Sequence, residues 1–425
     1  MKLRKPTIVV ATAVATGALV LVVMNLSLGD KQIDRPPQHL YAVTDPQFLR
    51  TMSVMLGPPL TNGNRVEALL NGDQIFPAML EAIRSAKETV TLETYIYWSG
   101  SIGKEFADAL AERAKAGVHV HVLIDWVGSS KIDEGYLQEM QDAGVEFRRY
   151  NKPRWYTIGR VNNRTHRKLL VVDGKVGFTG GVGIADKWLG NADSPEHWRD
   201  SHFRIEGPAV AHLQAAFLDN WTKATGAVLH GAPYFPSLKG VGPELAQMFI
   251  SSPGGGAESM QLMYLLSISA ATKSVRLSMS YFVPDDVAIA SFVDALGRGV
   301  RVQLILPGEN IDTSVVRRAS RAQWGKLLRA GAEIHEYQPT MFHCKVMIVD
   351  DVWVSVGSTN FDSRSFSVND EANLNVHGAE FAQRQSAVFE QDLKQSRRIS
   401  LEEWENRPWR EKLIEHASAI LSSQL

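Results

Sequence analysis

Hydrophobic and polar positions alternate along the chain with the period of helices in some segments and with the period of strands in others. Residues 82–97 pass from the end of a helical pattern into a strand-like run in which Val90 and Leu92 point to one face. Residues 106–110 return to a helical pattern, and residues 117–125 form a nearly continuous apolar run typical of a buried strand. Helices that alternate with β-rich runs predict an α/β fold, with helices on both faces of its sheets.

This succession of patterns occurs twice. The offset between matched positions is nearly constant: it is 186 residues from Phe106 to Phe292 and 187 residues from Ala143 to Ala330. A constant offset over several elements indicates duplication. We therefore expect two related α/β halves with a linker rich in Gly and Pro between them, which divides the body into residues 61–225, 226–256 and 257–400.

The N-terminal end differs in composition from the body. The segment from Thr7 to Leu28 holds no charged residue over 22 positions, which at about 1.5 Å per residue is long enough for a helix to cross a membrane. Three basic residues precede it, which favours an N-terminus on the inner side. We predict an uncleaved transmembrane anchor at residues 1–29, with a cleaved signal peptide as the alternative.

The segments next to the two halves carry weaker patterns. Residues 30–60 contain five prolines and suit a tether between the membrane and the body. Residues 401–425 have the pattern of an amphipathic helix, for which packing on the core is favoured over docking on a membrane.

Composition limits the classes of function. The chain is 44% hydrophobic and 21% charged, as in ordinary globular proteins, and its formal net charge of −1 gives no global attraction for nucleic acid. Its single cysteine, Cys344, excludes an intrachain disulfide and a metal site built from several cysteines. Cys344 lies between two polar residues of a strand-like run, so we expect it to point to the opposite face and to pack in the core.

Each half carries one His-x-Lys-x4-Asp array at an equivalent position. The arrays are His166, Lys168 and Asp173 in the first half, and His343, Lys345 and Asp350 in the second. In both arrays the histidine and the lysine are two residues apart in a strand-like run, so one face of the strand presents an imidazole beside an ammonium group. Two complete arrays at equivalent places in a duplicated chain favour a catalytic role over a structural one.

These side chains suit reaction at a phosphodiester. One imidazole must be neutral to attack phosphorus and the other protonated to give a proton to the leaving oxygen, and a pKa near 6.5 permits both states. The two lysines would hold the phosphoryl oxygens, with hydrogen bonds from Ser358 and Asn360. A carboxylate is expected behind each histidine to fix its tautomer, and Asp200 and Glu371 are the candidates.

The paired arrays, with Tyr281-Phe282-Val283-Pro284-Asp285 and the segment from Asn360 to Phe366, resemble the phospholipase D superfamily and specifically its bacterial cardiolipin synthase branch. The resemblance implies an active site between the halves, a phosphohistidine intermediate, and neither metal nor organic cofactor. It suggests His166 as the nucleophile and His343 as the general acid. The implied reaction transfers a phosphatidyl group from phosphatidylglycerol to a second alcohol. One departure is Gly183, which stands where the first array of the family commonly has an asparagine.

The substrate class is less constrained than the reaction class. Residues 148–168 hold eight basic residues, no acidic residue and several aromatic ones. Such a strip suits anionic lipid headgroups or a nucleic-acid backbone, and a solvated loop is the plain alternative. The predicted anchor favours a phospholipid partner at a bacterial inner membrane, with the catalytic body on the outer side and no stable nucleic-acid partner. Phosphatidyl transfer therefore ranks above hydrolysis to phosphatidic acid, and a nuclease ranks third.

Overall fold

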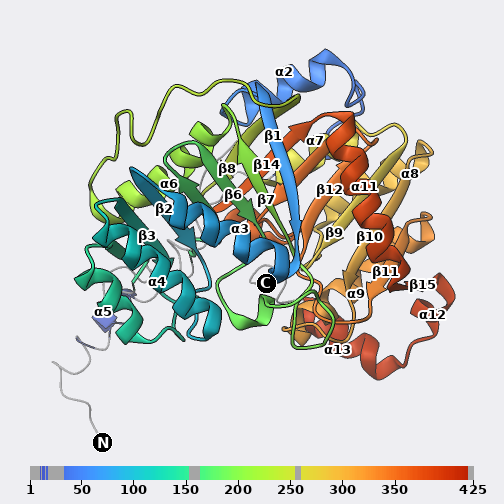
Figure 1. Ribbon diagram of the computed structural model, residues 1–425. Helices are drawn as coiled ribbons and strands as arrows, with labels where there is room; N and C mark the ends of the chain where they lie inside the picture. The colour runs from blue at the N-terminus through green and yellow to red at the C-terminus, as the bar shows by residue number, and fades with distance from the viewer. Residues whose placement is uncertain are drawn as a thin grey trace, which may run out of the picture.

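In the computed structural model, which describes residues 10, 12–14, 16–17, 33–152, 163–253 and 260–419, fifteen strands form one mixed sheet with helices on both faces (Figure 1). The elements of the first half are β1 Thr61–Leu70, α3 Asn71–Ser85, β2 Thr89–Thr94, α4 Ser101–Lys115, β3 His119–Asp125, α5 Glu134–Asp142, β4 Glu146–Tyr150, β5 Leu169–Val172, β6 Val176–Gly180, the 3₁₀ turn η2 Asp186–Trp188, β7 Ser201–Glu206 and α6 Val210–Thr225.

The second half repeats this series. Its elements are β8 Glu244–Ser251, α7 Met260–Ser269, β9 Ser274–Met279, α8 Asp286–Gly297, β10 Arg301–Pro307, α9 Ser314–Arg329, β11 Glu333–Tyr337, β12 Lys345–Val349, β13 Trp353–Gly357, α10 Ser363–Ser367, β14 Glu371–His377, α11 Ala379–Lys394 and β15 Ser396–Ile399. From the centre of the sheet outward, the strand order is β1-β7-β6-β5-β2-β3-β4 on one side and β8-β14-β13-β12-β9-β10-β11-β15 on the other. The two orders differ by seven strands at every step, with β15 added at one edge, so the duplication predicted from the sequence is present in the topology.

The two halves share one sheet. The sequence pattern had led us to expect a separate sheet in each half. Strand β1 pairs with β8, at Thr61 with Ala246 and at Asn64 with Glu244, and this join contains a break in register. A buried asparagine stabilises it, because Asn64 Nδ2 donates to the carbonyl of Glu244 at 3.3 Å. The join holds the halves in one body, so side chains from both can be placed with respect to each other.

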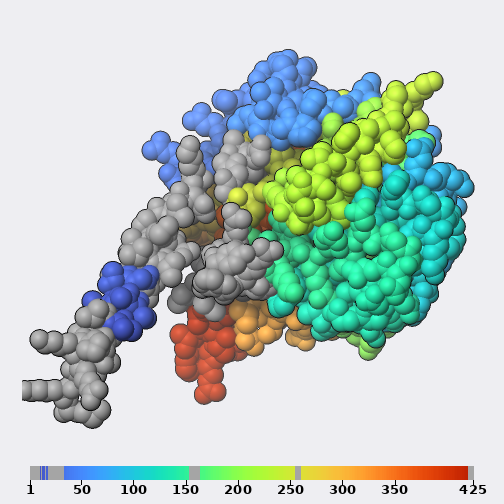
Figure 2. Space-filling view, turned by 90° about the vertical axis from the view of Figure 1, so that its left-hand side faces the viewer, coloured from blue at the N-terminus to red at the C-terminus, as the bar shows by residue number. Residues whose placement is uncertain are grey.

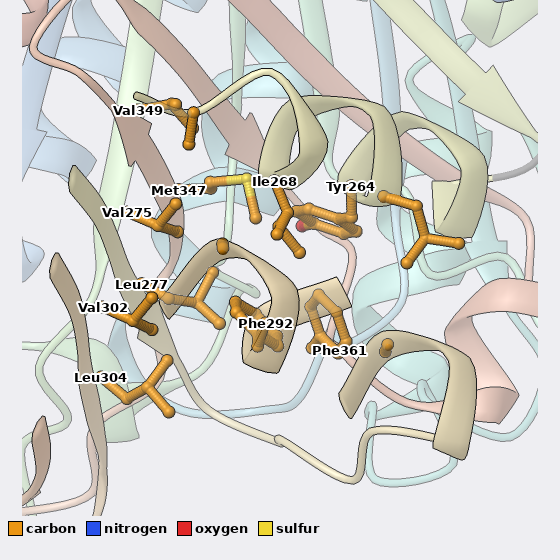
Figure 3. Packing of buried hydrophobic residues seen from close by; sticks show 14 of the residues in the cluster. Tyr264, Ile268, Val275, Leu277, Phe292, Val302, Leu304, Met347, Val349 and Phe361 are labelled. Carbon is orange, nitrogen blue, oxygen red and sulfur yellow. The ribbon is translucent and has the colours of Figure 1, made fainter. Parts of the chain in front are cut away.

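Each half has its own apolar core on one face of the sheet, and a third core is shared. Helices α3 and α4 cover the first half, and α7, α8 and α9 cover the second. Figure 3 shows the second core, where Phe292 of α8 lies among Leu277 of β9 and Leu304 of β10. The shared core combines residues of α6 and α11 with strands of both halves, for example Phe217 and Phe381.

Two segments expected to be connectors are partly folded. Within residues 30–60, helix α2 (Pro46–Met55) buries Phe48 and Met52 completely in the core of the second half. The ring of Phe48 meets that of Trp353 edge-on, with centroids 5.0 Å apart. The expected linker at 226–256 contains β8, so the second half begins earlier than the sequence indicated, and residues 226–243 cross the surface of the first half (Figure 2).

The C-terminal helical pattern is interrupted, and its first part packs on the core of the second half through Leu401 and Trp404. It forms two helices, α12 (Leu401–Asn406) and α13 (Trp409–Ala419). Helix α13 packs on α9 through its buried Glu415, which lies 3.2 Å from Arg321, while Trp409 and Leu413 are 69% and 62% exposed. This second helix therefore attaches to the body through a polar residue.

The predicted anchor, from Thr7 to Leu28, lies largely outside the described residues. Among the residues that the structure does describe, no helix has the length and apolar character needed to span a membrane.

Candidate active site

The histidines of the two arrays meet in one cavity. This cavity has a volume of about 390 Å³, and its lining includes His166 and Lys168 of the first half and His343 and Asn360 of the second. Backbone contacts between the halves hold both histidines. The N–H of His166 donates to the carbonyl of Asp370 at 2.8 Å, and the N–H of His343 donates to the carbonyl of Arg199 at 2.7 Å.

Each histidine is oriented by a carboxylate from the opposite half. His166 Nδ1 lies 3.0 and 3.1 Å from the two carboxylate oxygens of Glu371, and His343 Nδ1 lies 2.7 Å from Asp200 Oδ2. Both carboxylates are completely buried. Because each Nδ1–H donates to a carboxylate, the lone pair of each neutral ring is at Nε2, the nitrogen available to a substrate.

Further hydrogen bonds fix the two carboxylates. Trp188 Nε1 donates to Asp200 Oδ2 at 3.0 Å, and the backbone N–H of Ser201 donates to Asp200 Oδ1 at 2.8 Å. Ser358 Oγ donates to Glu371 Oε2 at 2.5 Å. Ser358 was expected to bind phosphate, but its hydroxyl is fully buried behind the histidine and positions the carboxylate instead.

The two lysines occupy different surroundings. Lys168 Nζ donates to the carbonyl of His166 at 2.7 Å and lies 5.7 Å from the centroid of the Tyr95 ring. Lys345 Nζ donates to the carbonyl of His343 and to Ser280 Oγ, both at 2.7 Å. Ser280 in turn donates to Asn360 Oδ1 at 2.7 Å. Since the oxygen of the Asn360 amide accepts this bond, its NH₂ group is left to donate to a ligand in the cavity.

Burial sets the protonation of the site. It lowers the pKa of His166 to about 4, against the attraction of Glu371, and it lowers the pKa of Lys168 to about 7. The pKa of His343 is also lowered, by burial and then by the positive charge of Lys345. Burial opposes the charged form of Glu371, but the attraction of His166 and Lys168 outweighs it, so the pKa of Glu371 lies below its ordinary value. In the absence of an anion, His166 is therefore a neutral imidazole at pH 7.

The aspartates that complete the two arrays are not in the cavity. Asp173 accepts hydrogen bonds from the backbone N–H groups of residues 87–89, at 2.8 to 3.1 Å. Asp350 does the same for residues 272–274, at 2.7 to 2.8 Å. Each lies at the far end of its strand, five residues and about 16 Å of extended chain from the lysine. Each aspartate therefore stabilises the start of the neighbouring strand. We had expected both aspartates to lie near the histidines, and the structure does not place them there.

Comparison with known proteins shows the family to which the chain belongs. The model "Cardiolipin synthase, PLD-like domain" matches residues 79–221 and 264–393, a stretch in each half. The chain is 34% identical over 385 residues to a cardiolipin synthase of Alkalihalophilus pseudofirmus, covering 89% of this chain and 76% of that protein. It is 35% identical over 362 residues to cardiolipin synthase 2 of Bacillus anthracis, covering 84% and 70%. The chain belongs to the cardiolipin synthase family.

Membership in the cardiolipin synthase family makes the chain a phosphatidyltransferase of the phospholipase D superfamily, which confirms the resemblance seen in the sequence. Among solved structures, the phosphatidylserine synthase of Haemophilus influenzae is similar, with a TM-score of 0.69. That similarity covers 90% of this chain and all of the other at 14% identity, so it supports the fold alone.

The departure at Gly183 from the family's usual asparagine has a steric explanation. A Cβ atom at Gly183 would lie 2.8 Å from Ile96 Cβ and 3.2 Å from two ring carbons of Trp188. The indole of Trp188 therefore occupies the space next to this position, and its Nε1 binds Asp200. Trp188 also meets the ring of His343, with centroids 5.4 Å apart. No pattern in the sequence indicated this role of Trp188.

The basic strip at 148–168 does not form one surface among its described residues. Arg167 is fully buried between the halves and lies 3.0 Å from Asp219 Oδ2, while Arg149 pairs with Glu134 at the surface. Arg164 and Lys168 line the cavity. Cys344 is buried in the shared core, as expected from its place on the strand, and burial raises the pKa of its thiol to about 12.

Proposed function

We propose that this protein transfers the phosphatidyl group of phosphatidylglycerol to a second lipid alcohol through a phosphohistidine intermediate, and so makes cardiolipin. The observation that carries the proposal is the pair of imidazoles, one from each half, that line one cavity with carboxylates crossed behind them. The names of the relatives support the choice of phosphatidylglycerol as substrate.

In the first step, Nε2 of His166 attacks the phosphorus atom. The bond from phosphorus to the glycerol oxygen breaks, and this oxygen takes a proton from His343. The low pKa of His166, about 4, supports its role as nucleophile because the ring is already neutral. Asp200 and the negative charge of the bound lipid favour the protonated form of His343 in the complex.

In the second step, the hydroxyl of the acceptor attacks the same phosphorus atom and its proton passes to His343. The bond from phosphorus to nitrogen breaks, which restores His166. Lys168 and Lys345 stabilise the charge on the phosphoryl oxygens, with a hydrogen bond from the amide of Asn360. If water replaces the alcohol, the product is phosphatidic acid, so the acceptor alone separates transfer from hydrolysis.

The test uses the purified full chain in detergent with labelled phosphatidylglycerol. Cardiolipin plus glycerol is expected, and phosphatidic acid alone, or cleaved DNA with no lipid product, would overturn the proposal. His166→Ala and His343→Ala should each lower cardiolipin formation by about 10³-fold or more, because each removes a group that takes part in bond making or proton transfer. Full activity in either variant would contradict the assignment.

The expected membrane location is part of the same proposal. It places the body on the outer side of the inner membrane, held by the anchor predicted from Thr7 to Leu28. A protease added to intact spheroplasts should then digest the body of the protein. Digestion only after lysis would overturn this orientation.

A further inference from the structure

Two arginines that line the cavity, Arg164 and Arg364, take no part in the chemistry described above. Arg164 lines the cavity, yet only 5% of its surface is exposed. Its Nη1 is buried and has no hydrogen-bond partner among the residues that the structure describes. The ion pair that it makes, from Nη1 to Asp125 Oδ1, spans 3.8 Å, which is too long for a hydrogen bond.

Asp125 does not account for the presence of Arg164. Its carboxylate already accepts hydrogen bonds from the backbone N–H groups of Val127, Gly128 and Thr165, at 2.8, 3.0 and 3.2 Å. Burial raises the pKa of Asp125 to about 6, against the attraction of Arg164. A buried guanidinium with an unused donor is uncommon in proteins unless an anion completes it.

The second half has no cation at the position equivalent to Arg164, although Arg364 of that half also lines the cavity. Arg164 lies two residues before His166, and the equivalent residue two positions before His343 is Met341, which is completely buried. A group needed by every phosphate-binding half-site would be expected in both halves. Arg164 is therefore suited to an anion that only one side of the cavity receives.

We propose that Arg164 binds the phosphodiester of the acceptor lipid, so that the cavity selects an anionic glycerophospholipid over water or a neutral alcohol. This inference rests on the proposed function. The phosphate of the donor has Lys168, Lys345 and Asn360 as its partners. An acceptor that carries its own phosphodiester brings a second negative charge into a cavity of about 390 Å³ and needs a cation of its own there.

Arg164 positions the acceptor and does not react. In the step that it serves, the acceptor hydroxyl oxygen forms a bond to phosphorus, the bond from phosphorus to His166 breaks, and the hydroxyl proton passes to His343. Removing the guanidinium should therefore slow transfer to an anionic acceptor and leave attack on the donor intact.

Two reactions of the same phosphatidylglycerol separate these roles. Exchange of labelled free glycerol into phosphatidylglycerol needs the donor step and a neutral acceptor. Cardiolipin formation needs the donor step and an anionic acceptor. Both are measured with the purified full chain in detergent, for the wild type and for Arg164→Met, which introduces the residue that the second half has at this position.

Arg164→Met should lower cardiolipin formation about 10- to 100-fold, as expected for the loss of hydrogen bonds between charged groups, and change glycerol exchange by less than about threefold. Arg164→Lys keeps the charge and should retain more cardiolipin formation than Arg164→Met. Arg149→Gln is the matched control, because it removes a cation of the same basic segment that pairs with Glu134 at the surface. It should leave both reactions unchanged.

The outcomes are distinct. An equal loss of both reactions would overturn the inference, because Arg164 would then serve the donor step or the fold. Unchanged cardiolipin formation in Arg164→Met would also overturn it. If Arg164→Met unfolds at a lower temperature than the wild type, the ratio of the two reactions is compared instead of their separate rates. The same ratio is then measured in Arg164→Lys, which is the milder change. A wild type that performs neither reaction would instead overturn the proposed function.

Discussion

The two halves of the active site share a framework and differ in how they hold their lysines. In both, a histidine and a lysine leave the same face of a strand and a carboxylate from the other half binds Nδ1. In the first half, Lys168 lies over the Tyr95 ring. In the second half, Lys345 donates to Ser280, which continues to Asn360.

This difference shows that duplication preserved the geometry of the site while the chemistry of each side diverged. An ammonium group over an aromatic face gives no hydrogen bond to that face, so Lys168, which donates to the carbonyl of His166, keeps its other donors for the phosphoryl oxygens. An ammonium group in a chain of hydrogen bonds is fixed in one direction and polarises the partners along that chain. The ammonium group of Lys168, on the side of His166, is therefore less restricted in direction than that of Lys345, on the side of His343.

Changes to the two crossed carboxylates should have the largest effects and should distinguish the roles of the two histidines. Glu371→Gln and Asp200→Asn should each lower cardiolipin formation about 10- to 100-fold, because each leaves a histidine without the group that fixes its tautomer. A donor lipid with p-nitrophenol as its leaving group needs no proton from His343. Release of p-nitrophenol should therefore recover in Asp200→Asn and stay low in Glu371→Gln. Equal recovery in both would show that the two histidines are not specialised as proposed.

The surroundings of the lysines predict a smaller effect. Ser280→Ala removes the hydroxyl that links Lys345 to Asn360 and should lower kcat/KM about 3- to 10-fold. The matched change in the first half, Tyr95→Phe, keeps the ring below Lys168 and should stay within about twofold of the wild type. Steady-state kinetics with phosphatidylglycerol in mixed micelles would measure both. Equal losses would mean that the two lysines depend on hydroxyl groups in the same way.

The buried histidines predict the smallest effect, on stability. The folded chain protonates His166 at a pKa of about 4, whereas an unfolded histidine does so near 6.5. Between these values the unfolded chain binds the proton first, so the free energy of unfolding falls as the pH is lowered from 6.5 to 4. His166→Asn should remove about 2–3 kcal/mol of this fall. Denaturant unfolding at several pH values would measure it, with the half-exposed His197→Asn as control. An unchanged pH dependence would count against the burial of His166 as its cause.

The sequence predicted much of the fold because duplication leaves a signal that simple periodicity does not. The constant offset between the halves identified the equivalent elements, and the strand orders of the two halves agree with it. It could not show that β1 and β8 join the halves into one sheet. That pairing depends on two strands far apart in the chain meeting at an irregular register, which no local pattern records.

The site was predicted in its residue types and less well in their roles. The candidates His166, His343, Asp200 and Glu371 lie together in the structure. They could be identified from the sequence because their residue types in this pattern are rare. Asp173 belongs to the same short array, but an extended strand carries it away from the histidine, so a shared motif did not mean a shared location. Ser280 gave no signal, since a serine at the end of a strand is ordinary until its neighbours are known.

The exchange of carboxylates between the halves bears on how such an enzyme can arise. A single repeat carries one histidine and the acid that belongs to a different histidine, so by itself it has no complete half-site. Two copies of one ancestral repeat, facing each other across a twofold axis, would complete both at once. Fusion into one chain then freed the copies to differ, which an identical pair cannot do.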